Sequence, residues 1–325
     1  MPVSSSNRLL LASWNIANLG VQERSKGARK VLAHIMKRFN LIAMQEINDD
    51  YRKFVDIVKL MGRDFDFIMS DSAGNDERLA YVFNTRRVGP GNLFGEVALR
   101  PREYLKRNVK VHYRQSRQDK VQTFKNVWFT PFDGNPFIGS FNCGEIDFLL
   151  ANVHLYFGKF QQSSKEADRR KYARRVLEIY ALAKWAQDRS AGGNAWDKDI
   201  VLLGDMDVPN MKNNEATIKA LEQFSWTAVD LYEETGTART ERLTRIGGSN
   251  LGNDKTYDQI AFAPTALKNR IVSHGVFDFD AVVFASKWKQ LARTRTGAKT
   301  VKAFNPYLRR YLSDHRPIWV ELRTN

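Results

Sequence analysis

The sequence is poor in cysteine, with Cys143 alone among 325 residues. No disulfide can therefore form within the chain, which fits a reducing compartment. No apolar run approaches the roughly 20 residues that a membrane-spanning helix needs, and the short apolar stretch near the start lacks the charge pattern and cleavage site of a secretory signal. These absences predict a cytoplasmic protein without a membrane span.

Several catalytic signatures are missing as well. The sequence contains no HExxH motif and no pair of cysteines, so a zinc site is disfavoured. It has no Walker A loop and no GxSxG motif. Nucleotide hydrolysis by a P-loop and acyl transfer by a nucleophile elbow are therefore disfavoured too.

Positive charge is the most informative part of the composition. The chain has 51 Lys and Arg against 36 Asp and Glu, a formal net charge of +15. The whole excess lies in two segments: 99–125 has nine basic and two acidic residues, and 284–310 has eight basic residues and no acidic one. A solvated face is the ordinary explanation of one such segment. Two on an otherwise balanced chain favour a polyanion-binding surface, with nucleic acid the first candidate and an anionic membrane the second.

Aromatic residues are interleaved with the cations in both segments. Cations neutralise phosphates and aromatic rings stack on unpaired bases, although the rings could instead pack on the body of the protein. Neither segment has base-reading geometry, so we expect backbone contacts and low sequence specificity. The residues predicted to contact nucleic acid are Arg100, Arg102, Lys106, Arg107, Lys110, Arg114, Arg293, Arg295 and Lys299.

Short apolar strands and amphipathic helices are mixed along the chain. Apolar spacing predicts helices at 25–39, 163–187 and near 214–223. We read the stretch 274–284 as a strand and 293–300 as a mobile loop. No linker, repeat or low-complexity tract is present, so we expect one domain over 1–325, an α/β or α+β sandwich in which the basic segments are insertions or loops.

Polar residues stand at the ends of several apolar runs. Each alone is an ordinary cap or turn former, but strand ends on one edge of a sheet converge in space. Carboxylates and an amide without a thiolate suit a hard cation such as Mg²⁺, or Mn²⁺ as a substitute. An acidic metal site on a basic protein indicates phosphate ester chemistry. These strand-end residues are Asn15, Glu46, His154, Asp205, Asp207, Asp258, Asp314 and His315.

Asp314 and His315 are neighbours just before the last predicted strand. Neighbours within a strand point to opposite faces, but at a loop-to-strand junction both can face one site, Asp314 toward a metal and His315 toward the phosphate. A histidine works best as an acid or base when a carboxylate fixes its tautomer. Another acid must therefore orient His315.

The ordered motifs SWNIANLG, MQEI, DERLAYVF, NVHL, LLGDMD, YDQIAF and SDHRP extend over residues 8–322. In this order they resemble the endonuclease/exonuclease/phosphatase superfamily, and the chain looks like a deoxyribonuclease I-type member. The resemblance implies a four-layered αββα sandwich, with two packed, mostly antiparallel sheets flanked by helices. It also implies a divalent-metal-dependent catalytic domain.

The resemblance assigns the metal and water sites by position. Asn15 and Glu46 match the residues that hold the divalent metal, with Asp314 close by. Asp205 matches the acid that positions or activates the attacking water. The family pattern Gly-Asp-x-Asn reads GDMD here, so Asp207 replaces an amide that donates to phosphate, and an ionised carboxylate cannot donate. Asp207 therefore binds metal, is protonated or is turned away; we favour metal binding.

The two histidine motifs each match a supporting acid. Glu77 matches the carboxylate that supports His154, and Asp258 matches the acid that orients His315. Which histidine acts as the acid and which as the base stays open, as does the number of metal ions.

The substrate is predicted from the variable parts. The inositol phosphatases of the superfamily carry Trp-Cys-Asp-Arg at the YDQI position, abasic-site enzymes usually have Tyr in place of His154, and its sphingomyelinases are mostly exported. With the basic segments, these differences favour a monomeric, Mg²⁺-dependent nuclease with DNA as substrate and RNA as an additional one. The alternatives are a phosphomonoesterase or lipid phosphodiesterase with the same site, and a nucleic-acid-binding protein without catalysis.

Overall fold

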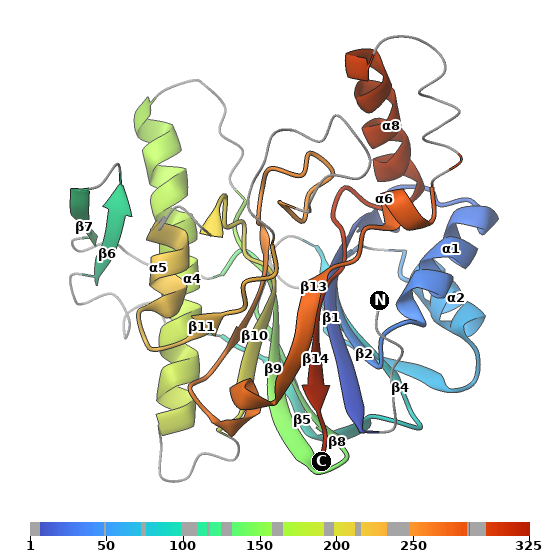
Figure 1. Ribbon diagram of the computed structural model, residues 1–325, viewed down its shortest axis with the longest axis horizontal. Coiled ribbons are helices and arrows are strands. Elements are labelled where there is room, and N and C mark those ends of the chain that lie inside the picture. Colours follow the sequence, from blue (N-terminus) through green and yellow to red (C-terminus); the bar gives the residue numbers. More distant parts are fainter. Residues whose placement is uncertain are drawn as a thin grey trace.

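Two six-stranded sheets pack face to face, and helices cover their outer faces (Figure 1). This four-layered sandwich confirms the predicted fold class. The computed structural model describes residues 7–48, 50–72, 76–98, 109–115, 118–124, 132–157, 165–191, 198–211, 216–232, 247–284, 286 and 297–325. Across these ranges, no helix combines the length and the apolar character needed to cross a bilayer.

The first sheet contains the strands that begin and end the chain. Its β1–β2 pair is parallel, and its other pairs are antiparallel. Helices α1 (Lys26–Met36) and α2 (Arg52–Met61) lie on its outer face, and Ser25 caps α1 by accepting from the backbone N–H of Ala28. In spatial order the strands are β13 (Ile271–Val276), β14 (Ile318–Arg323), β1 (Arg8–Leu19), β2 (Leu41–Ile47), β4 (Arg78–Asn84) and β3 (Phe65–Met69).

The second sheet is built from the middle of the chain. Its β9–β10 pair is parallel and the others are antiparallel. Helices α4 (Lys165–Ala191) and α5 (Ala216–Glu222) cover its outer face, as the sequence predicted. The strands, again in spatial order, are β11 (Thr227–Ala228), β12 (Asp258–Phe262), β10 (Ile200–Asp205), β9 (Ile146–His154), β8 (Phe137–Cys143) and β5 (Gly89–Glu96). The 3₁₀ turn η2 (Ala266–Arg270) leads from β12 to β13.

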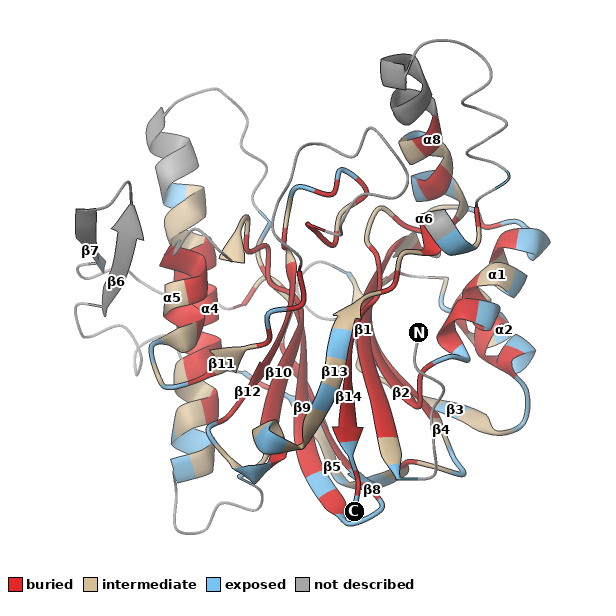
Figure 2. Cartoon of the chain, viewed as in Figure 1, coloured by how far each residue is buried: buried red, intermediate tan, exposed pale blue. Residues whose placement is uncertain are grey.

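Apolar side chains leave both faces of the central strands and fill three layers of core. On β1, Leu9 and Leu11 face the second sheet, while Leu10, Ala12 and Trp14 face the helices. Successive strand residues point to opposite faces, so a strand buried on both sides reads as a nearly continuous apolar run. Figure 2 shows the resulting buried centre of both sheets.

Buried polar side chains join the two sheets near the ends of β2 and β9, next to Glu46 and His154. The Gln45 side-chain nitrogen on β2 donates to the Asn152 oxygen on β9 at 2.7 Å. Asn152 in turn donates to the carbonyls of Met44 and Ala80, each at 3.1 Å. All four residues are buried, and buried polar groups that find partners fix one relative position of the sheets.

Two sequence predictions are wrong. The stretch 274–284 is not one strand, because β13 ends at Val276 and the short helix α6 (Phe279–Val282) follows. Arg316, fully buried, explains this change: it pairs with Asp280 of α6 through two hydrogen bonds of 2.8 and 2.7 Å. The segment 297–300, predicted as loop, opens helix α8 (Gly297–Tyr311), whose Phe304 and Leu308 pack into the core one turn apart.

The basic segments are described only in part. Strands β6 (Val109–Gln115) and β7 (Gln118–Phe124) form a separate hairpin beside α5 (Figure 1). Lys110 and Arg114 lie on β6 and Lys299 lies on α8, but the structure does not describe their side chains. The remaining predicted nucleic-acid contacts, which lie outside the described residues, are Arg100, Arg102, Lys106, Arg107, Arg293 and Arg295.

Candidate active site

Three strand ends of the second sheet bring predicted site residues side by side. Asp205, the last residue of β10, is paired in register with His154 at the end of the parallel strand β9. It is also paired with Asp258, which opens the antiparallel strand β12. Adjacent strands lie about 4.8 Å apart, so these groups meet without any long loop to position them.

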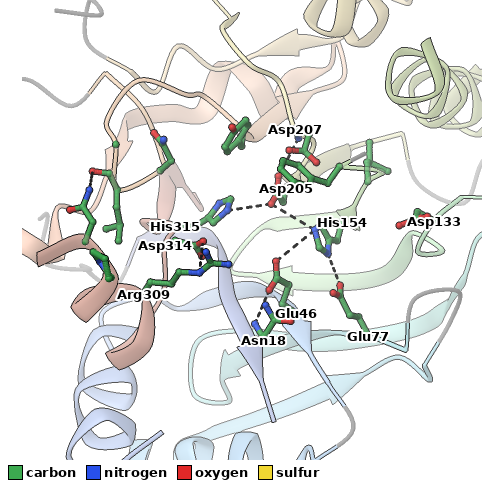
Figure 3. A pocket seen from close by; sticks show the side chains of 18 residues that line it. Asn18, Glu46, Glu77, Asp133, His154, Asp205, Asp207, Arg309, Asp314 and His315 are labelled. Carbon is green, nitrogen blue, oxygen red and sulfur yellow. Dashed lines mark hydrogen bonds and ion pairs between the residues drawn. The ribbon is translucent and has the colours of Figure 1, made fainter. Parts of the chain in front are cut away.

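Two histidines converge on one carboxylate oxygen, and Figure 3 shows them on either side of Asp205, with Glu77 behind His154. His154 Nδ1 lies 2.5 Å from Glu77 Oε2, and His315 Nδ1 lies 2.8 Å from Asp258 Oδ2. Their Nε2 atoms lie 3.9 and 3.7 Å from Asp205 Oδ2. The structure therefore brings together the two predicted histidines, their predicted acids and Asp205.

The first sheet contributes an amide and a carboxylate. The Asn15 side-chain nitrogen donates to Glu46 Oε1 at 2.7 Å and to Asp205 Oδ2 at 3.0 Å. The Asn15 oxygen accepts from the backbone N–H of Ala17 at 2.9 Å, and Glu46 Oε2 accepts from that of Asn18 at 2.7 Å. Asn15 thus turns its nitrogen, rather than a metal-binding oxygen, toward the two carboxylates.

Strained backbone surrounds this group. Ala17, Asn18, Glu46 and Asp207 have φ between 51° and 62°, in the left-handed region. Such residues cost on the order of 1–3 kcal/mol each and collect at functional sites. The pairing of β2 with both of its neighbours shifts register next to Glu46. Such irregularities re-aim a side chain, here placing the Glu46 carboxylate in the site.

Five of these residues, Glu46, Glu77, His154, Asp205 and His315, line a cavity of about 830 Å³, whereas Asn15 and Asp258 are fully buried. Arg309 is the one Lys or Arg among the lining residues that the structure describes. Against it stand the acids Glu46, Glu77, Asp133, Asp205, Asp207 and Asp314. A cavity of this charge repels phosphate unless a cation offsets it.

The oxygen-rich donor set fits a hard divalent cation. Asp207 is 2% exposed, and its Oδ2 is buried with no hydrogen-bond partner. Two groups of three residues could each hold a metal ion, because within each group one ligand atom per residue lies within 4.8 Å of the others. The groups are Glu46, Glu77 and His154, and Asp205, Asp258 and His315.

Asp314 and His315 both line the cavity, as the loop-to-strand junction predicted. The Asp314 carbonyl accepts from the N–H of Leu251 at 2.9 Å, and His315 forms an isolated bridge with Asn250. The Asp314 side chain lies 3.1 Å from the Nε atom of Arg309 on α8. Asp314 is therefore in the cavity but ion-paired.

The charges of the cluster support one another. Burial lowers the pKa of His154, but its hydrogen bond to Glu77 and the charges of Glu77, Asp205 and Glu46 together raise it well above its ordinary value. Burial likewise lowers the pKa of His315, but Asp258, Asp205 and Asp314 together raise it well above the ordinary value. For Asp205 burial raises the pKa, but the two positive histidines lower it below the ordinary range. Protonated histidines thus surround an ionised Asp205.

Asp207 behaves differently from Asp205. Burial, and then the charge of Asp205, raise the pKa of Asp207 well above its ordinary value. Asp207 lines the cavity and is not turned away from it. This environment favours a neutral carboxyl, or one whose charge a bound cation offsets.

Two buried arginines were missed in the sequence. Arg24 donates to the carbonyls of Ala17 and Leu312 at 2.7 and 2.9 Å, and so joins the chain after Asn15 to the chain before Asp314. Burial lowers the pKa of Arg24 to about 10. Arg175 of α4 donates to the carbonyl of Asp207 at 3.1 Å. No motif marks either arginine, because their partners are backbone carbonyls.

The sequence matches no protein-family model and no curated protein sequence. Among solved structures, D. rerio TDP2 in complex with a single-stranded DNA product aligns with a TM-score of 0.52 at 12% identity, over 98% of this chain and 99% of that one. An AP endonuclease from Archaeoglobus fulgidus aligns with a TM-score of 0.50 at 16% identity, over 96% and 98%. A functionally unknown conserved protein from Enterococcus faecalis V583 has a TM-score of 0.52 at 14% identity, over 96% and 98%. The chain therefore shares the fold of these proteins, the four-layered sandwich that the resemblance of its motifs implied.

Proposed function

We propose that the protein is a divalent-metal-dependent phosphodiesterase that cleaves nucleic acid, DNA in the first place, through in-line attack by water. The observation that carries this proposal is the convergence of His154 and His315 on Asp205 Oδ2, at 3.9 and 3.7 Å. Each histidine is backed by a buried or partly buried carboxylate. This arrangement suits proton transfer at two sides of one phosphate.

In this proposal Asp205 accepts a hydrogen bond from the attacking water and takes its proton. Its lowered pKa keeps it ionised near neutral pH. The two protonated histidines donate from Nε2, one to a non-bridging phosphate oxygen and the other, as general acid, to the leaving oxygen. Positioned acid–base groups of this kind contribute about 10²–10⁴ in rate.

Glu46 would hold the cation, with Asp314 and Asp207 as further oxygen donors. When bound, Mg²⁺ polarises the phosphoryl oxygen and offsets the negative charge of the cavity. The contacts of Asn15 support an orienting role, because its amide nitrogen faces both Glu46 and Asp205. We infer one domain and a monomer for the chain, as the sequence predicted.

The substrate is inferred from charge. The formal net charge of +15 favours a polyanion over a small neutral substrate. The similarly folded TDP2 was solved with a single-stranded DNA product, which is in line with a nucleic-acid substrate here. Neither a lipid nor a phosphomonoester accounts for the cationic segments as simply.

A substrate panel tests the proposal. Supercoiled plasmid, linear duplex, single strands, RNA, inositol phosphates and sphingomyelin are each incubated with Mg²⁺, Mn²⁺ or EDTA. We expect cleavage of nucleic acid that stops in EDTA and falls at least about 100-fold in His154→Gln and in His315→Gln. His34→Gln, at an exposed helix position outside the cavity, is the matched control and should retain wild-type activity.

The other functions give different results in the same panel. Phosphate release from inositol phosphates with intact DNA would favour the phosphomonoesterase. Salt-sensitive DNA binding without cleavage in either metal would favour the non-catalytic protein. Cleavage that persists in EDTA and in both histidine variants would overturn the proposed mechanism.

A further inference from the structure

An aromatic surface runs outward from the catalytic cluster along one wall of the cavity. The Tyr257 ring lies 5.9 Å from the His315 ring, at an interplanar angle of 35°. Phe157 contacts Tyr257 edge to face, with centroids 6.5 Å apart at 86°. Both residues line the cavity, and Phe157 is 44% exposed. A partly exposed aromatic side chain, Phe157, therefore lies one residue away from His315.

Arg175 holds this surface in place. It is 3% exposed, and it donates to the backbone carbonyls of both Phe157 and Asp207. Its guanidinium carbon also lies 5.9 Å from the Phe157 ring centroid, within the range of a cation–π contact. The same buried side chain therefore fixes Phe157 and Asp207, so the aromatic face has a set position relative to the reacting phosphate.

Another part of the cavity wall has a different chemistry. It is formed by Asn305, Pro306 and Arg309 of α8, and by Gly252 of the loop that leads into β12. Arg309 supplies a cation that can pair with a substrate phosphate in place of Asp314. An exposed aromatic side chain and a cation that line the same cavity as the reacting residues match a nucleotide, which has a flat base and charged phosphates.

We infer that Phe157, with Tyr257 behind it, is a subsite for an unpaired nucleobase beside the scissile phosphate, so that the enzyme acts on single-stranded or frayed nucleic acid. This inference rests on the proposed function. A base inside a duplex has neighbours on both faces and its edges paired, so it cannot lie on Phe157 without being extruded. An unpaired base presents a free face, and stacking of this kind tolerates any sequence. The cavity, at about 830 Å³, lies in the range of sites that enclose a single ligand, about 300–1,000 Å³.

Dinucleotides with one phosphodiester bond test the subsite. We compare dinucleotides with two bases against those in which a tetrahydrofuran residue replaces the nucleoside on one side of the phosphate. For the wild type with Mg²⁺, we expect kcat/KM to fall roughly tenfold when the base on one particular side is missing. Phe157→Ala should lose roughly tenfold on the dinucleotide with both bases and nothing further on the one that lacks that base.

Two more variants control for folding and for the chemistry of the ring. Phe157→Trp keeps an aromatic face and should keep the preference for the base. Leu60→Ala removes a similarly exposed apolar side chain on α2, outside the cavity, and should match the wild type. Wild-type enzyme should also cleave a single strand faster than the same sequence in a blunt duplex.

The outcomes separate the inference from the proposed function. An equal loss in Phe157→Ala on base-bearing and base-free dinucleotides would overturn the base subsite, as would faster cleavage of the duplex, while leaving the nuclease in place. A loss that is restored by no aromatic replacement would also count against stacking. No Mg²⁺-dependent cleavage of any nucleic acid by the wild type would overturn the proposed function, and the subsite with it.

Discussion

Replacing Asp258 by Asn removes one charge from a buried histidine–carboxylate pair. The Asp258 side chain is 0% exposed and that of His315 is 12% exposed, with 2.8 Å between the paired atoms. At an effective dielectric constant of about 20, unit charges separated by 2.8 Å attract by about 6 kcal/mol. Desolvation of both groups offsets part of this, and removal of one partner from a buried pair costs about 3–5 kcal/mol. We therefore predict that Asp258→Asn lowers the free energy of unfolding by about 3 kcal/mol at about pH 6.

The loss should depend on pH in a defined direction. The pKa of His315 is raised well above its ordinary value in the folded state, whereas in the unfolded chain it is about 6.5. While Asp258 is ionised, the stability that protonation of His315 contributes is thus present at about pH 6.5 and is lost as the pH rises through the folded pKa of His315. At about pH 10 a neutral imidazole can still donate to the amide oxygen that the substitution introduces, so the loss should be smaller there.

Urea denaturation in EDTA at the two pH values, followed by circular dichroism, measures this loss. Asp56→Asn is the matched control, because Asp56 pairs with Arg29 at 2.9 Å but its side chain is 53% exposed. It should lose less than about 1 kcal/mol at either pH. Asp258→Asn should also lower kcat by about 10²–10⁴ with Mg²⁺. A loss of stability no larger than the control's, or one that grows with pH, would refute this account of the pair.

Three further predictions concern the metal and the buried charges. Mg²⁺ should raise the thermal unfolding midpoint of the wild type in differential scanning fluorimetry, because a ligand at 100 times its Kd stabilises the folded state by about 2.7 kcal/mol. It should not raise the midpoint of Glu46→Gln. An equal rise in both proteins would exclude Glu46 as a metal ligand. Burial and the charge of Asp205 raise the pKa of Asp207, so the stability of the wild type in EDTA should fall as the pH rises through that pKa. In thermal melts between about pH 5 and 9, Asp207→Asn should remove this fall. An unchanged pH profile in the variant would argue against a raised pKa for Asp207. Arg24→Met leaves buried carbonyls without the donor that Arg24 supplies. It should lower the free energy of unfolding, measured by urea denaturation, by about 3 kcal/mol. A loss under about 1 kcal/mol would show that these Arg24 hydrogen bonds are dispensable.

Much of the fold and of the cluster could be predicted because strands have a simple geometry. Polar residues at the ends of apolar runs, such as His154 and Asp205, fall side by side once β9 and β10 pair in parallel. Ser25, predicted to begin a helix, does cap α1. The sequence could indicate these features because each depends on local pattern or on one strand edge.

Other features depend on distant segments and left no pattern to read. Arg24 donates to Leu312, which is 288 positions away, and no local signal separates it from the rest of the 51 Lys and Arg. In the sequence Phe157 looks like an ordinary core residue, and only the structure shows that it lines the cavity and is partly exposed. The first residues of helix α8, 297–300, were mistaken for a loop because they are basic and include a glycine.

The most direct test of the account is the single-turnover rate of cleavage of a labelled single strand as a function of Mg²⁺ concentration, for the wild type and for Asp205→Asn. We predict a rate that saturates with Mg²⁺ in the wild type, is abolished by EDTA, and is lower by about 10² or more in the variant at saturating Mg²⁺. Cleavage that is independent of Mg²⁺, or is equally fast when Asp205 is replaced, would contradict the claim that this cluster hydrolyses phosphodiesters.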